Sequence, residues 1–212
     1  MKSKTFVNGT IVKKYEIPLE QIKELNDTFD KQRKKLLSES SRLAGRINTE
    51  LSASTFIQNI KIYNTIKNCI NEFILASNHF GLVDAPVMDL HISSVWINDM
   101  LEGEYNPPHT HFNPHSGWST VLFLKVPEII NDAKHKHKFR DGQLCFTWKE
   151  GHGSFYVTPK VGDFYIFRAD HQHSVMPFRT KKKGDVRRSM SFNFEKKTEE
   201  NNARQENKLY CE

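Results

Sequence analysis

Two histidines separated by a single residue, His109 and His111, carry the strongest chemical signal in this 212-residue sequence. They close the run Asn-Pro-Pro-His-Thr-His at 106–111, which is typical of a β-strand. Side chains alternate between the two faces of a strand, so both imidazoles are expected on the same face. Neutral imidazole is the commonest metal ligand in proteins. The pair therefore predicts half of a metal site.

The other half of such a site is available far downstream, where His173 stands in the run His-Gln-His-Ser-Val at 171–175. A basic strand follows at 187–193, and its period of two places Arg187, Ser189, Ser191 and Asn193 on one face. Iron, zinc, copper and nickel all accept imidazole, so the ligand type does not choose the metal. Together these residues predict a mononuclear metal site inside a β-barrel.

The strands that must position these residues begin after Gly81, where the hydrophobic pattern changes to a period of two. Short alternating runs separated by glycine- and aspartate-rich turns are typical of a sandwich or jelly roll, not of βαβ units. The expected strands are 87–98, 106–111, 118–126, 143–148, 154–158, 163–167, 174–178 and 186–194.

The N-terminal part predicts one opening strand or hairpin arm and two helices. The strand covers 5–17, and Pro18 then begins a helix that runs to about Leu37. A well-patterned second helix over 54–80 is expected to pack on the outside of the sheet. The fold class is thus mainly β with N-terminal helices (α+β). We expect one domain over 1–212, divided into supporting elements (1–85), a β core (86–195) and a polar tail (196–212).

The composition excludes some classes of protein but does not identify the function. Apolar residues make up 37% of the chain, and no apolar run is long enough for a membrane span or a secretory signal. Three scattered cysteines suit reduced thiols, so we expect a cytoplasmic protein. The formal net charge is +6, with lysine-rich clusters at 31–35, 134–138 and 181–183. Such clusters indicate solvated helix faces and loops more readily than a nucleic-acid footprint.

Several motifs in a fixed order resemble the 2-oxoglutarate- and Fe(II)-dependent oxygenases, in particular the small members found in phages and marine bacteria. The likeness runs from Trp96 to Phe194, roughly half of the chain. The motifs that carry it are Trp-Ile-Asn at 96–98, Glu-Tyr-Asn-Pro-Pro-His-Thr-His at 104–111, Leu-Phe-Leu-Lys-Val-Pro at 122–127, Gly-Asp-Phe-Tyr-Ile-Phe at 162–167, His-Ser-Val at 173–175 and Arg-Arg-Ser-Met-Ser-Phe-Asn at 187–193.

The resemblance implies a double-stranded β-helix (a cupin-like jelly roll) and a role for each residue that matches a motif. His109, His111 and His173 would bind Fe(II), while Arg187 and Ser189 would bind the far carboxylate of 2-oxoglutarate. The implied reaction is hydroxylation of a substrate with O2, releasing succinate and CO2. No catalytic residue beyond the metal ligands is implied. A phage-encoded enzyme would work in the host cytoplasm.

The chain departs from the family pattern at position 111, where histidine stands in place of the usual carboxylate ligand. Three neutral ligands also suit tetrahedral zinc. A carboxylate from elsewhere in the chain, or another nearby ligand, remains an alternative. The candidates are Asp99, Glu104 and Asp170 for the carboxylate, Asn113 or His115 for a displaced ligand, and His171 as a rival of His173.

Two other functions stay open at this point. One is a three-histidine metalloenzyme that does not use 2-oxoglutarate, either a cupin-like dioxygenase or a zinc hydrolase. The other is a catalytically inactive β-barrel interaction module. A carboxylate clamp at Arg187 and Ser189 favours the oxygenase over the first, and the complete ligand set favours it over the second. The substrate is undefined, with a protein side chain or other macromolecule preferred, and the oligomeric state is not predicted.

Overall fold

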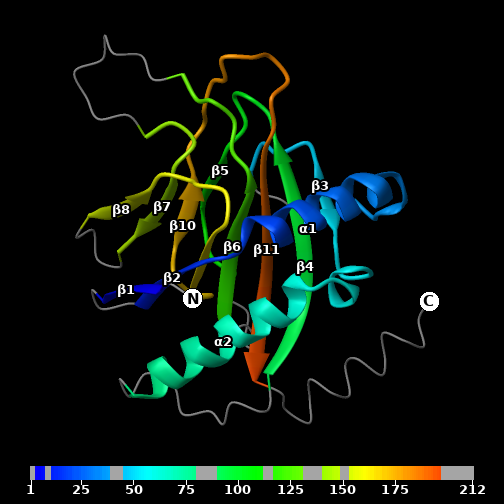
Figure 1. The fold of residues 1–212 in the computed structure, drawn as a ribbon. Coiled ribbons are helices and arrows are strands. Elements are labelled where there is room, and N and C mark those ends of the chain that lie inside the picture. The colour runs from blue at the N-terminus through cyan, green and yellow to red at the C-terminus, as the bar shows by residue number, and fades with distance from the viewer. Residues whose placement is uncertain are drawn as a thin grey trace.

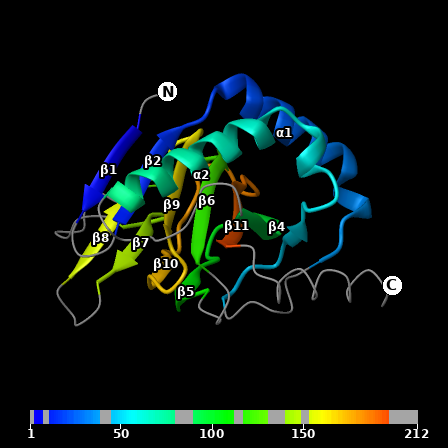
Figure 2. The same ribbon diagram turned by 90° about the horizontal axis from the view of Figure 1, so that it is seen from below.

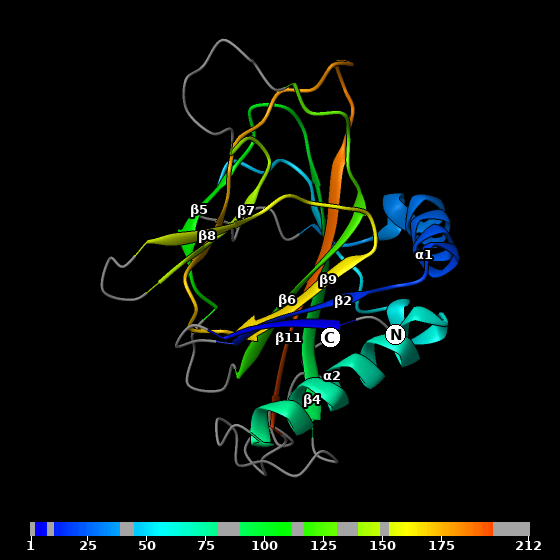
Figure 3. The ribbon, with the colours of Figure 1, turned by 60° about the vertical axis from the view of Figure 1, so that its left-hand side comes forward.

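The computed structural model describes residues 3–7, 11–38, 45–79, 90–111, 117–130, 140–148 and 153–196. Helices, a seven-stranded sheet and a four-stranded sheet form three layers, and Figure 3 shows the helices and the small sheet on opposite sides of the large one. The helices are α1 (Leu19–Gln32) and α2 (Ile62–His79), with short 3-10 helices at Arg33–Lys35 and Ile57–Asn59. None of the helices in the described part of the chain is long and apolar enough to span a membrane.

The large sheet has the strand order β1-β2-β9-β6-β11-β4-β3, and the small sheet has the order β5-β10-β7-β8 (Figure 1). All pairs in both sheets are antiparallel. The large sheet consists of β1 (Ser3–Val7), β2 (Ile11–Glu16), β3 (Glu50–Ser52), β4 (Leu90–Met100), β6 (Trp118–Lys125), β9 (Asp163–Arg168) and β11 (Arg187–Lys196). The small sheet consists of β5 (Asn106–His109), β7 (Leu144–Thr147), β8 (Ser154–Val157) and β10 (His173–Val175).

From β4 onward the chain passes back and forth between the two sheets, which is the winding of a double-stranded β-helix. β4, β6, β9 and β11 belong to the large sheet, and β5, β7, β8 and β10 belong to the small one. The predicted mainly-β fold with N-terminal helices is confirmed. The opening run at 5–17 forms two strands, β1 and β2, whose hairpin extends the large sheet beyond β9.

Strand β6 shows why the large sheet is buried on both faces. Its alternate residues Leu122 and Leu124 join the core beneath the helices, whereas Val121 and Phe123 join the core between the two sheets. A strand buried on both sides reads as a continuous apolar run, as it does at 121–124. Figure 2 shows α1 and α2 lying along the same side of the large sheet.

The second helix begins later than predicted. Residues 54–61 form turns and a 3-10 helix, and α2 starts at Ile62. Phe56 and Ile57 are buried from this turn, and the Ser54 hydroxyl accepts a hydrogen bond from the backbone N–H of Val95 at 3.2 Å. The apolar residues that suggested an earlier helix start are therefore core residues held by the turn.

Residues 45–52, here called the strap, cross from one sheet to the other at the edge of the sandwich. Arg46 forms an isolated bridge with Tyr105 just before β5, and β3 pairs with β4 in the large sheet. The backbone N–H of Asp99 also donates to the Thr49 carbonyl at 3.0 Å. The strap therefore spans the gap between β4 and β5.

The register of β11 against β4 sets cross-strand neighbours that share one face of the sheet. Arg187 is paired with Met100, Ser189 with Asn98, and Ser191 with Trp96. In the same register β3 places Glu50 beside Asn98. Directly opposed residues in a sheet point to the same side, so these side chains share the face that looks toward the small sheet.

The next residue of β11 points the other way and ties the sheet to the helical layer. Arg188 is buried, and its guanidinium donates to Asp99 at 2.6 and 2.9 Å, to Asn26 at 3.0 Å and to Asp30 at 2.8 Å. Arg33 also pairs with Asp99. This cluster links β11 and β4 to α1 and the 3-10 helix that follows it.

Candidate active site

Three imidazoles meet between the sheets. His109 ends β5, His111 follows it, and His173 begins β10 as the direct cross-strand partner of His109. The ligand nitrogens all lie within 4.8 Å of one another. Their ring centroids are 4.3 to 5.1 Å apart. Three convergent imidazole nitrogens can hold a transition metal and leave further coordination positions open.

Hydrogen bonds set the tautomer of two of these rings. Nδ1 of His109 lies 2.8 Å from the Pro107 carbonyl oxygen, and Nδ1 of His173 lies 2.9 Å from the His171 carbonyl oxygen. A carbonyl oxygen only accepts, so each Nδ1 must carry the proton. This leaves the unprotonated Nε2 of each ring as the atom that can bind a metal, the usual arrangement for a metal-binding histidine.

Burial keeps the cluster neutral. Desolvation lowers the pKa of all three histidines, and the mutual repulsion of their charged forms adds to the effect for His111 and His173. The pKa of His111 falls to about 4. Metal binding needs unprotonated imidazole, so the cluster is ready for a metal well below neutral pH.

A desolvated cation, Arg187, lies in the same cavity. Its side chain is fully buried, with Nε donating to the Gly142 carbonyl at 3.2 Å and Nη1 near Met100 Sδ at 3.5 Å. The guanidinium lies 5.0 Å from the centroid of the Phe123 ring. Desolvation lowers the pKa of Arg187 to about 10. Within the described ranges, Nη2 has no hydrogen-bond partner. A buried guanidinium with an unused donor fits a carboxylate ligand.

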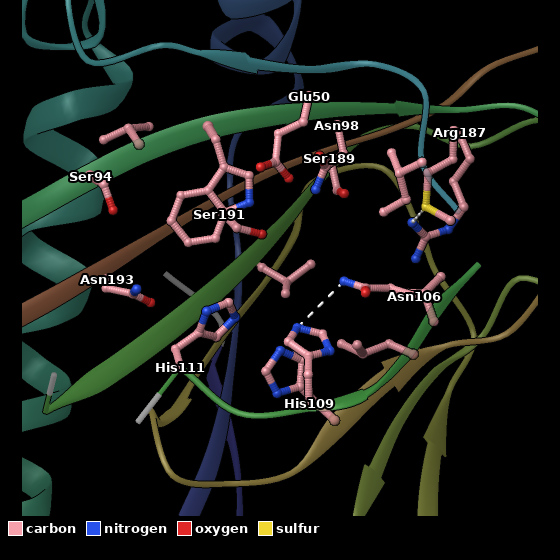
Figure 4. Close-up of a pocket in the computed structure, with 18 of the residues that line it drawn as sticks. Glu50, Ser94, Asn98, Asn106, His109, His111, Arg187, Ser189, Ser191 and Asn193 are labelled. Atoms are coloured by element: carbon pink, nitrogen blue, oxygen red, sulfur yellow. Dashed lines mark hydrogen bonds between the residues drawn. The ribbon is translucent and has the colours of Figure 1, made fainter. Parts of the chain in front are cut away.

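The cavity that holds these groups has a volume of about 420 Å³. Figure 4 shows His109 and His111 across the cavity from Ser189 and Ser191, with Arg187 toward one end and Asn193 toward the other. This is enough space for a five-carbon dicarboxylate and part of a second molecule. The alternation expected along β11 is present, because Arg187, Ser189, Ser191 and Asn193 all line the cavity.

The three alternative carboxylates lie elsewhere. Asp99 binds Arg188, Asp170 pairs with Arg168 at 2.9 Å, and Glu104 accepts from Asn48 at 2.6 Å and from the Leu101 N–H at 2.9 Å. None of the three belongs to the histidine cluster or lines the cavity.

Of the other alternative ligands, the structure describes His171, which lies outside the cluster. The His171 ring packs against Phe146 and Trp148, with centroids 5.5 and 5.3 Å away. Asn113 and His115 fall outside the described residues.

Sequence reasoning missed the residues that the strap and its neighbours contribute. Ile47, Glu50 and Ser52 line the cavity from a segment with no readable periodicity. Asn106 lines it too, with Nδ2 3.4 Å from Nε2 of His109 (Figure 4). Strict alternation would put Asn106 and His109, three residues apart, on opposite faces of the strand, so no signal in the sequence pointed to Asn106, and the pairing of β5 with β10 is irregular here.

Comparisons with known proteins identify a similar family and similar folds. Residues 94–193 match a family described as putative 2OG-Fe(II) oxygenases. A comparison with curated protein sequences found no match.

Solved structures share the fold. A Pseudomonas putida prolyl-4-hydroxylase is 16% identical, with a TM-score of 0.58 over 88% of this chain and 93% of that one. A viral collagen prolyl hydroxylase from Paramecium bursaria Chlorella virus-1, in complex with 2OG, is 13% identical, with a TM-score of 0.57 over 88% and 96%. A Trichoplax adhaerens prolyl hydroxylase bound to a hypoxia inducible factor peptide fragment is 12% identical, with a TM-score of 0.50 over 87% and 78%.

Proposed function

We propose that this chain, whose residues 94–193 match the family of 2-oxoglutarate- and Fe(II)-dependent oxygenases, hydroxylates its substrate with O2 and 2-oxoglutarate. The observation that carries the proposal is the buried Arg187 in the same cavity as three convergent imidazoles. A three-histidine zinc hydrolase or a cupin-like dioxygenase does not need a buried arginine such as Arg187 to bind the carboxylate of a co-substrate.

His109, His111 and His173 would hold the Fe(II) ion through nitrogen atoms. The hydrogen bonds from Nδ1 of His109 and His173 to backbone carbonyls support this role, since they fix the rings and raise the basicity of Nε2. Three neutral ligands leave the ion its full double charge. A doubly negative 2-oxoglutarate balances that charge, so a carboxylate ligand from the protein is not required for electroneutrality.

Arg187 and Ser189 would bind the far carboxylate of 2-oxoglutarate. They are two residues apart on β11, both are buried, and both line the cavity. Nη2 of Arg187 supplies an unused donor, and Ser189 adds a hydroxyl from the same face of the strand. A charge-assisted hydrogen bond in a dry pocket is among the strongest that a protein makes.

Bound Fe(II) and 2-oxoglutarate supply the oxidation itself: O2 takes two electrons from the loss of CO2 and two from a substrate C–H bond, and its atoms end in succinate and the new hydroxyl. The residues of the chain orient the two reactants and exclude water. No side chain has to act as a general base. We further propose that the hydroxylated group belongs to a protein side chain or another macromolecule.

Anaerobic titration of the Fe(II) protein with 2-oxoglutarate tests the proposal. Chelation through the carboxylate and keto oxygens is expected to give a weak visible charge-transfer band. Arg187→Met, which removes the charge and keeps much of the volume, should weaken 2-oxoglutarate binding by about thirtyfold or more, because losing one partner of a buried charge pair costs about 2–5 kcal/mol. Arg168→Met is the matched control, since Arg168 is exposed and pairs with Asp170.

Two results would contradict the oxygenase function. One is tight zinc binding without any charge-transfer band, which would favour the three-histidine zinc enzyme. The other is unchanged 2-oxoglutarate affinity in Arg187→Met, which would remove the clamp from the proposal.

A further inference from the structure

One acidic side chain lies in the cavity. Glu50 is only 5% exposed and lines the cavity from the strap. Figure 4 shows its carboxylate directed into the cavity beside Asn98 and Ser189. Among the described lining residues, Glu50 and Arg187 alone carry a fixed charge, and Arg187 is already assigned to 2-oxoglutarate.

Trp96 lines the same cavity and lies on the same face of the sheet as Glu50. Glu50 pairs with Asn98, two residues from Trp96 on β4, so the backbones of Glu50 and Trp96 are diagonal neighbours, roughly 7–8 Å apart. The Trp96 ring is half-buried, and its centroid lies 5.5 Å from that of His111. One long, flexible side chain entering the cavity can therefore lie against the indole, reach the carboxylate and pass close to the metal ligands.

The chemistry of this pair selects the charge of the substrate. A carboxylate accepts hydrogen bonds and repels anions, and its strongest partners are ammonium and guanidinium groups. The face of an indole attracts cations and packs against their aliphatic stems. On the basis of the proposed function, we propose that Glu50 and Trp96 bind a substrate with a cationic group on an aliphatic chain, such as the side chain of lysine or arginine.

The charges of the loaded site permit such a substrate. Three neutral imidazoles leave a divalent metal at +2, and 2-oxoglutarate offsets this with −2. The loaded metal centre therefore carries no net positive charge. An incoming cation meets the Glu50 carboxylate on the cavity wall, whereas a phosphate or another polyanion meets a buried negative group there.

The test compares cations with neutral analogues of the same shape. The anaerobic Fe(II)–2-oxoglutarate complex is titrated by calorimetry with the Nα-acetyl methylamides of lysine and norleucine, and of arginine and citrulline. At least one cation should bind about tenfold more tightly than its neutral partner. Glu50→Gln should reduce that preference to less than about twofold without weakening 2-oxoglutarate binding, and Trp96→Leu should reduce it in part. Glu128→Gln, at an exposed residue paired with Lys181, should change nothing.

Equal or undetectable binding within both pairs would overturn the proposal, as would an unchanged preference in Glu50→Gln. The charge-transfer band separates this failure from failure of the proposed function. If the band forms and the cations gain nothing, only the substrate assignment falls. If the band is absent, the oxygenase function falls first.

Discussion

At the scale of single residues, the defining feature is the imidazole of His111, at the position where the sequence resemblance leads one to expect a carboxylate. It completes a cluster with His109 and His173 in which all the ligand nitrogens lie within 4.8 Å of one another. The negative charge that a ligand carboxylate would bring is thus missing from the cluster, and Glu50 places one negative charge elsewhere on the cavity wall.

His111→Ala tests whether this residue is a ligand. We expect Fe(II) affinity to fall by more than about a hundredfold, since even changes behind the ligands cost 10- to 100-fold. His111→Asp should retain the metal but bind 2-oxoglutarate more weakly, because the site charge drops by one. Calorimetry measures both. His171→Gln is the control, and metal affinity unaffected by His111→Ala would exclude His111 as a ligand.

The same imidazoles make the metal-free protein sensitive to acid. Burial lowers the pKa of His109, His111 and His173 in the folded chain, while in the unfolded chain they titrate near 6.5. Below about pH 6.5 the unfolded chain therefore binds more protons, and stability falls as the pH drops toward the value of about 4 for His111. The melting temperature of the metal-free protein should decrease from pH 7.5 to pH 5, and less steeply in His111→Leu. A flat profile in the parent protein would contradict the burial of neutral imidazoles.

At the scale of elements, the strap depends on a close approach between two backbones. A Cβ added at Gly45 would lie 2.7 Å from both the Tyr105 carbonyl oxygen and Asn106 Oδ1. Gly45→Ala should therefore push the strap away from β5, lower the melting temperature by a few degrees and weaken 2-oxoglutarate binding through Asn106 and His109. Gly117→Ala is the matched control, because its added Cβ meets nothing nearer than 3.5 Å. Equal effects of the two substitutions would show that the strap tolerates displacement.

The strands of the core were predictable and the strap was not, for one physical reason. Strands such as β6 and β11 present alternate residues to different environments, and that alternation is visible in the sequence. The three residues of β3 are too few to show a period, and their place is set by pairing with β4, a contact distant in sequence. For the same reason His109, His173 and Arg187 could be identified as candidates, whereas Glu50 could not.

At the scale of the whole molecule, adjacent arginines of β11 serve the two sides of the large sheet. Arg187 faces the cavity, and Arg188 joins the sheet to α1 through Asp99, Asp30 and Asn26. Period-two alternation predicted that they would face opposite sides. The sequence alone could not show that two of the partners of Arg188, Asn26 and Asp30, would come from α1, more than 150 residues earlier, because that packing depends on how the helices cover the sheet.

Asp99→Asn measures how strongly this cluster holds the helical layer. Removing its buried partner leaves Arg188 with only the half-exposed Asp30 as a counter-charge, which is expected to cost about 3–5 kcal/mol in the free energy of unfolding. Asp30→Asn should cost much less, since the Asp30 side chain is 46% exposed. Denaturant titration compares the two variants. Equal losses would mean that burial does not strengthen the Asp99 contact.

Because Trp96 contacts His111, its fluorescence is expected to depend on which metal the protein holds. An open-shell ion bound at His111, such as Fe(II) or Cu(II), would lie close enough to the Trp96 indole to quench its fluorescence, whereas closed-shell Zn(II) would not. Of the other two tryptophans, Trp118 stacks on Phe194 in the core beneath the helices and Trp148 packs against His171, and both are present in the parent chain and in Trp96→Phe alike. In metal titrations, the parent chain and Trp96→Phe should therefore show different changes in fluorescence intensity with Fe(II) and the same change with Zn(II). The fluorescence of Trp96 would thus distinguish the bound ion without an activity assay.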